Sequence, residues 1–166
     1  MSELLHFEDV RVGDVRRFGR YEVTREEIVE FARQFDPQPF HVDEEAARHS
    51  LFGGLVASGW HTAAMLIRMI CDHAIGGTAT TGAAGFDDLR WIKPVRPGDV
   101  LSVETTVLGK SELPHRADVG TVRIQSRVLD QGGEAVMSLV SLVLYRRRSA
   151  GSAAPVHRES LPPRAP

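Results

Sequence analysis

Two short segments of the 166-residue chain carry residue types that could perform acid–base chemistry. The first is Asp36-Pro37-Gln38-Pro39-Phe40-His41, in which a carboxylate and an imidazole lie five positions apart. Its two prolines fix their own φ angles and restrict the residue before each, so the segment is stiff. A carboxylate and an imidazole held in fixed positions can activate water and relay a proton near neutral pH. The alternative is that Asp36 only ends a helix and His41 only precedes the next one.

The second segment, Gly53-Gly54-Leu55-Val56-Ala57-Ser58-Gly59-Trp60-His61, leads into a long predicted helix. N–H groups in the first turn of a helix have no internal partner and lie at the positive end of its dipole. Because Gly59 has no side chain to block a ligand, its N–H could bind a carbonyl oxygen and stabilise charge developing there. The alternative is that Gly59 only allows close packing of the helix on a sheet.

The remaining candidates for chemistry are weaker. His61 is interpreted as a partly buried packing residue, and the other histidines lack the paired spacing of a metal site. Cys71 lies on the apolar side of the long helix and is predicted to belong to the core. Ser58 lacks the Gly-x-Ser-x-Gly context of a nucleophile, and no phosphate-binding glycine motif occurs.

The elements that must position these residues are helical in the first half of the chain. A short strand is expected within 15–23, and Thr24 with Glu27 forms a capping box that begins a helix. Apolar residues at helical spacing indicate one buried stripe on it, and Asp36-Pro37 ends it. A short helix over 43–49 and a long helix over 59–74 complete this half. The apolar stripe consists of Ile28, Phe31, Ala32 and Phe35.

The second half has the two-residue period of strands. A glycine-rich loop over 76–85 is followed by predicted strands, of which the last is apolar on both faces and suits a central position. The fold class is therefore α+β, with one long helix packed across a curved, mostly antiparallel sheet. The expected strands cover residues 86–92, 100–108, 121–128 and 135–145.

Composition excludes several classes of protein. With 20 Lys and Arg against 22 Asp and Glu, the chain has no electrostatic footprint for nucleic acid or an anionic membrane. No apolar run is long enough for a membrane helix, and the N-terminus does not resemble a secretion signal. One domain is expected over residues 1–148, followed by a flexible Pro/Ala/Ser-rich tail over 149–166. A cytoplasmic location is the resulting prediction.

Together, the two segments resemble the MaoC-like family, which includes the (R)-specific enoyl-CoA hydratases and has the hotdog fold. The resemblance rests on the Asp-x-x-Pro-x-His loop, the glycine that opens the central helix, and the later Pro-x-x-Pro-Gly-Asp turn. It implies that Asp36 and His41 form a catalytic dyad and that the Gly59 N–H polarises a thioester carbonyl. The chain departs from the usual family motif at Gln38, where Asn is expected, and at Ser58, where His is frequent.

The resemblance implies reversible hydration of a trans-2-enoyl-CoA to a 3-hydroxyacyl-CoA, in fatty acid metabolism, with no metal and no cofactor beyond the substrate's own coenzyme A. The resemblance also implies a homodimer, and edge pairing between two copies would cover otherwise unpaired backbone groups. Two alternatives stay open: a hotdog acyl-CoA thioesterase, and a non-catalytic acyl-CoA-binding subunit. The further residues expected to bind substrate are Gln38, Phe40, Ser58, Trp60, Arg90 and Lys93.

The basis for these binding assignments differs from residue to residue. Arg90 and Lys93 bring positive charge that could meet the phosphates of coenzyme A, or could simply form a solvated face. Phe40 and Trp60 flank the expected site in the sequence and could line an acyl pocket, although core packing explains them nearly as well.

Overall fold

The computed structural model describes residues 4–148, and the tail predicted over 149–166 lies outside them. Its centre is a five-stranded sheet in the order β1-β3-β4-β5-β2, in which every neighbouring pair is antiparallel. The α+β class and the antiparallel sheet are therefore confirmed. The strands are β1 (Val15–Glu22), β2 (Thr80–Trp91), β3 (Val100–Leu113), β4 (Arg116–Leu129) and β5 (Ala135–Arg146).

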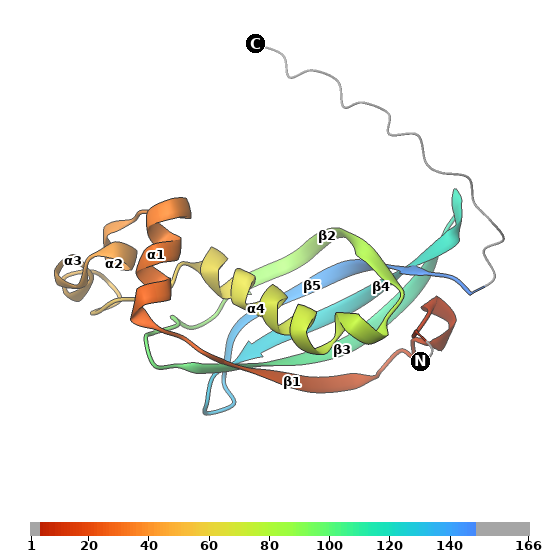
Figure 1. Cartoon of the computed structure of the whole chain (residues 1–166), viewed down its shortest axis with the longest axis horizontal. Helices are drawn as coiled ribbons and strands as arrows, with labels where there is room; N and C mark the ends of the chain where they lie inside the picture. The colour runs from red at the N-terminus through yellow and green to blue at the C-terminus, as the bar shows by residue number, and fades with distance from the viewer. Residues whose placement is uncertain (1–3, 149–166) are drawn as a thin grey trace, which may run out of the picture.

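One long helix, α4 (Gly59–His73), lies across a face of this sheet (Figure 1). Met65, Leu66 and Met69 on its inner side are at most 2% exposed and pack in one cluster with apolar residues of the strands. Burying such side chains stabilises a fold by roughly 1.5–3 kcal/mol each. The sheet and α4 thus form the rigid body on which the rest of the chain is arranged.

Three shorter helices gather at the end of the molecule where α4 begins (Figure 1). In α1 (Arg25–Phe35), the Thr24 side chain accepts a hydrogen bond from the Glu27 N–H, as the capping box predicted. The other two are α2 (Pro39–Val42) and α3 (Glu44–Arg48), and Asp43 caps the second of them through two backbone N–H groups.

Several boundaries differ from the sequence-based expectation. Strand β2 begins at Thr80, inside the glycine-rich stretch predicted as a loop, because that stretch pairs with β5 through several register shifts. The helix α2 was not predicted; Pro39 at its first position has the fixed φ that a helix start accepts. The prediction that Cys71 belongs to the core is wrong, since it lies on the exposed side of α4.

The two ends of the described chain are bound to each other at the opposite end of the sheet from α1. Asp9 is the last residue of the 3-10 turn η1 (Phe7–Asp9). Its carboxylate accepts two hydrogen bonds from the Arg148 guanidinium. Lys110 donates to the carbonyl oxygens of Phe7, Glu8 and Val10 and lies 4.7 Å from the centroid of the Phe7 ring. These contacts tie the start of the chain to β3 and to the end of β5.

Candidate active site

The stiff proline-containing loop places Asp36 and His41 at the end of α1 and within α2. Asp36 is the C-cap of α1, and its carbonyl oxygen accepts the Gln38 N–H at 2.8 Å. Pro39 then begins α2, which carries His41 within one helical turn. The two side chains therefore come from consecutive helices joined by a single tight turn.

The carboxylate and the imidazole face each other. Asp36 Oδ2 lies 3.5 Å from His41 Nε2, and the His41 side chain is 6% exposed against 20% for Asp36. The other ring nitrogen, Nδ1, lies 2.7 Å from the carbonyl oxygen of Val56. A carbonyl oxygen can only accept, so Nδ1 carries a proton, and Nε2 has a free lone pair whenever the ring holds no second proton. This lone pair points to the side on which the Asp36 carboxylate lies.

Two neutral donors hold the Asp36 carboxylate. The Ser58 hydroxyl donates to Oδ2 at 2.6 Å, and the Gln38 amide donates to Oδ1 at 2.8 Å. These hydrogen bonds, first from Ser58 and then from Gln38, hold the pKa of Asp36 below its ordinary value. Asp36 is consequently a carboxylate at neutral pH. The Gln38 amide makes this contact although it is one methylene longer than the Asn of the family motif.

Ser58 also organises the start of α4. Its fully buried hydroxyl oxygen accepts the Trp60 N–H at 3.2 Å, which makes it the N-cap of the helix. The same hydroxyl thus joins the Asp36 carboxylate to the helix N-terminus. Ser58 is not among the residues that line the cleft, so its contact with the substrate stays a prediction.

Gly59 is the first residue of α4, so its N–H has no partner within the helix. It lies on the same cleft as the dyad, as the sequence predicted for an oxyanion-binding group. A side-chain carbon built at Gly59 would come within 2.4 Å of the Trp91 indole. The alternative interpretation of Gly59, close packing against a strand, therefore also has a structural basis.

The dyad and Gly59 line one cleft of about 500 Å³, which is within the range typical of small-molecule sites. Phe40 and Trp60 line it too, so the residues expected to shape an acyl pocket are brought to the dyad. Phe40 packs edge-on to the His41 ring at 4.5 Å and Trp60 packs edge-on to Trp91 at 5.3 Å. The walls are mostly aromatic and aliphatic.

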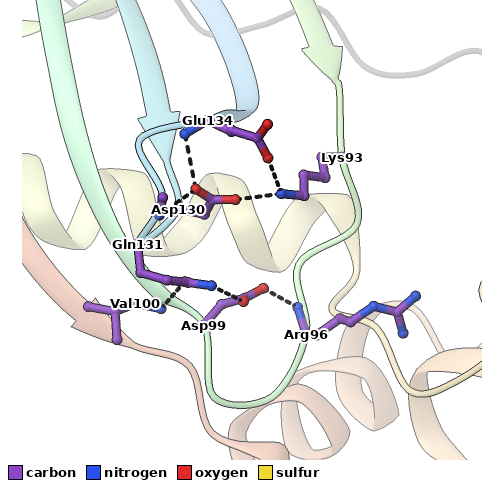
Figure 2. A network of polar contacts seen from close by, with 8 residues as sticks. Lys93, Arg96, Asp99, Val100, Asp130, Gln131 and Glu134 are labelled. Atoms are coloured by element: carbon purple, nitrogen blue, oxygen red, sulfur yellow. Dashed lines mark hydrogen bonds and ion pairs between the residues drawn. The ribbon is translucent and has the colours of Figure 1, made fainter.

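The two basic residues predicted to meet phosphates have different positions. Lys93 lines the cleft, but its ammonium group lies 2.7 Å from Asp130 and 2.6 Å from Glu134, which raise its pKa (Figure 2). Arg90 is not among the cleft residues; it precedes Trp91 on β2, and successive side chains of a strand point to opposite faces. The structure therefore does not bring Arg90 to the dyad.

The Lys93 ion pairs belong to a network that ties a wall of the cleft to the β4–β5 hairpin (Figure 2). Asp130 accepts the backbone N–H groups of Gly132 and Glu134, and Gln131 bridges to Asp99 at 3.1 Å. The segment that follows β2 is thus held by the turn between two other strands.

His61 is not among the residues that line the cleft. Its ring is 5% exposed and stacks on Phe31 at 4.7 Å, which fits the predicted packing role. Its Nδ1 has no hydrogen-bond partner within residues 4–148. Burial lowers the pKa of His61, so the imidazole is neutral at neutral pH.

A second cavity, of about 310 Å³, lies between the C-terminal half of α4 and the sheet. Its lining is largely apolar and includes Leu66, Ile70 and Leu139, but neither member of the dyad. Among the described residues there is no cluster of three or more His, Cys, Asp or Glu that could hold a metal ion. No helix within that same span is long and apolar enough to cross a membrane.

Two contributors to the site were not predicted from the sequence. Val56 supplies the carbonyl oxygen that orients His41, and Trp91 supplies the indole that covers Gly59. A backbone carbonyl has no sequence signature. Trp91 is 32 positions from Gly59, and only the packing of the start of α4 against the end of β2 brings the two residues together. The single sequence signal for Trp91 was its large aromatic type at the end of a predicted strand.

A five-stranded antiparallel sheet packed on one long central helix is the hotdog fold. Residues 9–128 match the sequence model of a family described as "MaoC like domain". The chain belongs to this MaoC-like family.

Three known proteins show how closely the family resembles this chain. A crystal structure of a MaoC-like dehydratase from Rhodospirillum rubrum is 48% identical, with a TM-score of 0.79 and coverage of 87% of this chain and 98% of that one. Mesaconyl-CoA hydratase of Cereibacter sphaeroides is 36% identical over 126 residues, which are 76% of this chain but 32% of that protein. R-hydratase PhaJ1 of Pseudomonas aeruginosa shares the fold. It is 23% identical, with a TM-score of 0.69 and coverage of 93% of this chain and 96% of that one.

Proposed function

We propose that the protein catalyses the reversible addition of water to a trans-2-enoyl-CoA thioester, giving the (R)-3-hydroxyacyl-CoA. The observation that carries the proposal is the 3.5 Å approach of His41 Nε2 to Asp36 Oδ2 in one cleft, with the Nδ1 proton directed to Val56. Membership of the MaoC-like family and the hydratase activity in the name of a 36% identical relative support the same reaction class.

The geometry of the dyad suits a water molecule in the cleft that contacts both of its members. With a neutral imidazole and an ionised carboxylate, both facing atoms accept hydrogen bonds, so one water can donate a hydrogen to each. Asp36 then orients the water, and the His41 Nε2 lone pair takes the proton that the water loses. A general base positioned in this way contributes typically about 10²–10⁴-fold to a rate.

The chemical step follows from this placement. The water oxygen bonds to C3 while the C2–C3 π electrons shift toward the thioester, leaving an enolate whose oxygen carries the charge. The Gly59 N–H, at the positive end of α4, stabilises that oxygen, and one such donor is worth about 10²–10³-fold. The His41 imidazolium then returns the proton to C2. The product has gained one water, and no electrons pass to or from a redox partner.

The decisive experiment follows a panel of trans-2-enoyl-CoA thioesters through the loss of conjugated enoyl absorbance, with identification of products. Wild type is compared with Asp36→Asn and His41→Ala, each expected to reduce turnover by about 10²-fold or more. Matched controls are Asp72→Asn and His49→Ala, which change the same residue types at positions that do not line the cleft. Their turnover is expected to equal that of wild type.

The products separate the proposal from its alternatives. Formation of an (R)-3-hydroxyacyl-CoA that both dyad variants lose supports the hydratase. Release of free coenzyme A would instead identify a thioesterase. Binding of acyl-CoA without turnover at any chain length would leave a non-catalytic role and contradict the proposal.

We further propose that the working form is a homodimer. Strand β2 is hydrogen-bonded only to β5 within the described sheet, so its other edge is available to a second copy. Phe86 on β2 is 55% exposed and Ile67 on α4 is 46% exposed. Exposed apolar side chains on a free edge strand favour association. Light scattering coupled to size exclusion tests this, and a strict monomer at micromolar concentration contradicts it.

A further inference from the structure

The contact between Gly59 and Trp91 leaves no room for a side chain at position 59 unless the indole moves. A side-chain carbon there would lie 2.4 Å from both Cε2 and Nε1 of the indole and 2.8 Å from its Cδ2. Gly59 is not among the glycines with a positive φ, so its backbone conformation is one that any residue adopts. The packing of the indole, rather than the backbone, therefore demands glycine.

Trp91 is held firmly in this position. It pairs with Met137 in the β2–β5 register, and the next two backbone N–H groups, of Ile92 and Lys93, both donate to the Val136 carbonyl oxygen at 2.8 and 3.2 Å. The Lys93 ammonium is then fixed between two carboxylates of the β4–β5 hairpin (Figure 2). On its open side the indole meets Trp60 edge-on at 5.3 Å.

The indole is placed where a bound thioester would need a wall. Trp91 and Gly59 line the same cleft as the dyad, and Trp91 is 49% exposed, so part of its surface is open to a ligand. An apolar ring beside a backbone N–H excludes water from it, and an N–H in a drier environment stabilises a developing negative charge more strongly.

We propose that Trp91 is a substrate-binding residue whose indole forms the wall that holds the thioester group against the Gly59 N–H. This inference rests on the hydratase function proposed above. The inference also explains why position 59 is glycine. The Trp91 indole, rather than a bound substrate, occupies the space that a side chain at this position would fill.

The chain permits a direct test because Trp60 and Trp91 are its only two tryptophans. Trp60→Phe leaves Trp91 as the sole indole and serves as the reference protein, whose kinetics are measured first. Gly59→Ala, Trp91→Ala and the double change Gly59→Ala/Trp91→Ala are then made in this background. Each protein is assayed for kcat and KM with crotonyl-CoA, and binding of unreactive butanoyl-CoA is measured by calorimetry.

The proposal predicts strong coupling between the two positions. Gly59→Ala displaces the indole and lowers kcat/KM by about 10²-fold, the scale expected of a misplacement near 1 Å. Trp91→Ala removes the wall and raises KM by about tenfold, with a smaller effect on kcat. In the double variant the methyl group has room, so kcat/KM returns to within about twofold of Trp91→Ala alone. Losses that multiply instead would show that the methyl group obstructs the substrate itself and would overturn the proposal.

Fluorescence separates failure of this inference from failure of the proposed function. In the Trp60→Phe protein, saturating butanoyl-CoA is expected to shift or quench the Trp91 emission. Calorimetric binding with unchanged emission would overturn the wall assignment even if hydration is confirmed. An emission change in a protein that hydrates no enoyl-CoA would contradict the hydratase function and leave Trp91 as a ligand-binding residue.

Discussion

The Ser58 hydroxyl donates to the same Asp36 oxygen, Oδ2, that faces His41 Nε2, at 2.6 Å against 3.5 Å. The carboxylate oxygen of the dyad is thus hydrogen-bonded to the N-cap residue of α4. Because Gln38 holds the other oxygen at 2.8 Å, the carboxylate plane is fixed independently of any ligand. Both donors act on the charge and orientation of Asp36, whatever contact they also make with a substrate.

Removing either donor is expected to raise the pKa of Asp36 toward its ordinary value, because both hydrogen bonds favour the ionised form. Gln38→Met keeps the length of this exposed side chain without its donor, and we expect kcat/KM to fall about three- to tenfold. The Asp36 carboxyl is followed by ¹³C NMR titration and assigned by its absence in Asp36→Asn.

Gln34→Met, an exposed change on α1, is the control for the Gln38 substitution. The Ser58→Ala variant is interpreted together with its melting temperature, since loss of an N-cap alone destabilises a protein by about 1 kcal/mol. An Asp36 titration that is the same in Gln38→Met and in wild type would show that the amide does not act on the carboxylate.

Buried His61 is expected to make the protein sensitive to mild acid. Its pKa in the folded state lies below the ordinary value of 6.5, so the unfolded chain binds more protons over the interval between the two. The free energy of unfolding therefore falls as the pH drops below about 6.5, by at most ~1.4 kcal/mol per pH unit for one proton. Urea unfolding at pH 7.5 and 5.5 measures this loss in wild type.

In His61→Phe, which keeps a ring against Phe31, the loss between the two pH values is expected to be smaller. The other histidines are common to both proteins, so the difference between the two losses isolates His61. Equal losses would contradict the assignment.

Lys93→Met distinguishes a structural role from recognition of phosphate. The variant leaves the largely buried Asp130 carboxylate without its cation, although two backbone N–H groups still bind it. We expect a loss of about 1–3 kcal/mol in the free energy of unfolding. Because two carboxylates hold the Lys93 ammonium, we expect KM to rise by the same factor for crotonyl-CoA and for crotonyl-N-acetylcysteamine, which has no phosphates. A rise for crotonyl-CoA alone would support the phosphate role.

Gly120 is expected to tolerate no side chain. A carbon built there would lie 2.3 Å from the Phe7 ring, and that ring is covered by Lys110. Gly120→Ala must displace the ring, and we expect it to lower the free energy of unfolding by about 1–3 kcal/mol. Gly109→Ala on β3 is the control, because a carbon there meets nothing within 4 Å. Thermal unfolding of the two variants gives the comparison, and equal melting temperatures would contradict the prediction.

The parts of the fold that could be predicted are those that depend on residues close together in the sequence. The capping box at Thr24 and the glycine before a wide apolar stripe located α1 and α4 to within a residue or so. The Asp36–His41 pairing could be anticipated because two prolines restrict the intervening loop. The loop predicted over 76–85 was wrong in part, because β2 begins at Thr80. Pairing with β5 overrides the turn preference of glycine there.

The parts that could not be predicted depend on which face of an element is covered. The apolar stripe of α4 is wide enough to include Cys71, but the sheet covers only part of it, and the helical period does not say which part. Trp91 and Gly59 meet because the start of α4 packs against the end of β2, 32 positions later in the chain. Lys93 pairs with carboxylates in a hairpin about 40 residues later. Each of these contacts requires the tertiary fold.

The ion pair between Arg148 and Asp9 has a practical consequence for handling the protein. It places both ends of the described chain at one end of the sheet, while α1, α2 and the start of α4 lie at the other (Figure 1). A label or surface attachment introduced beside residue 4 or residue 148 would stand away from the cleft. Immobilised protein would then present the end that carries the cleft to the solution, an orientation suited to testing the proposed acyl-CoA binding directly on a surface.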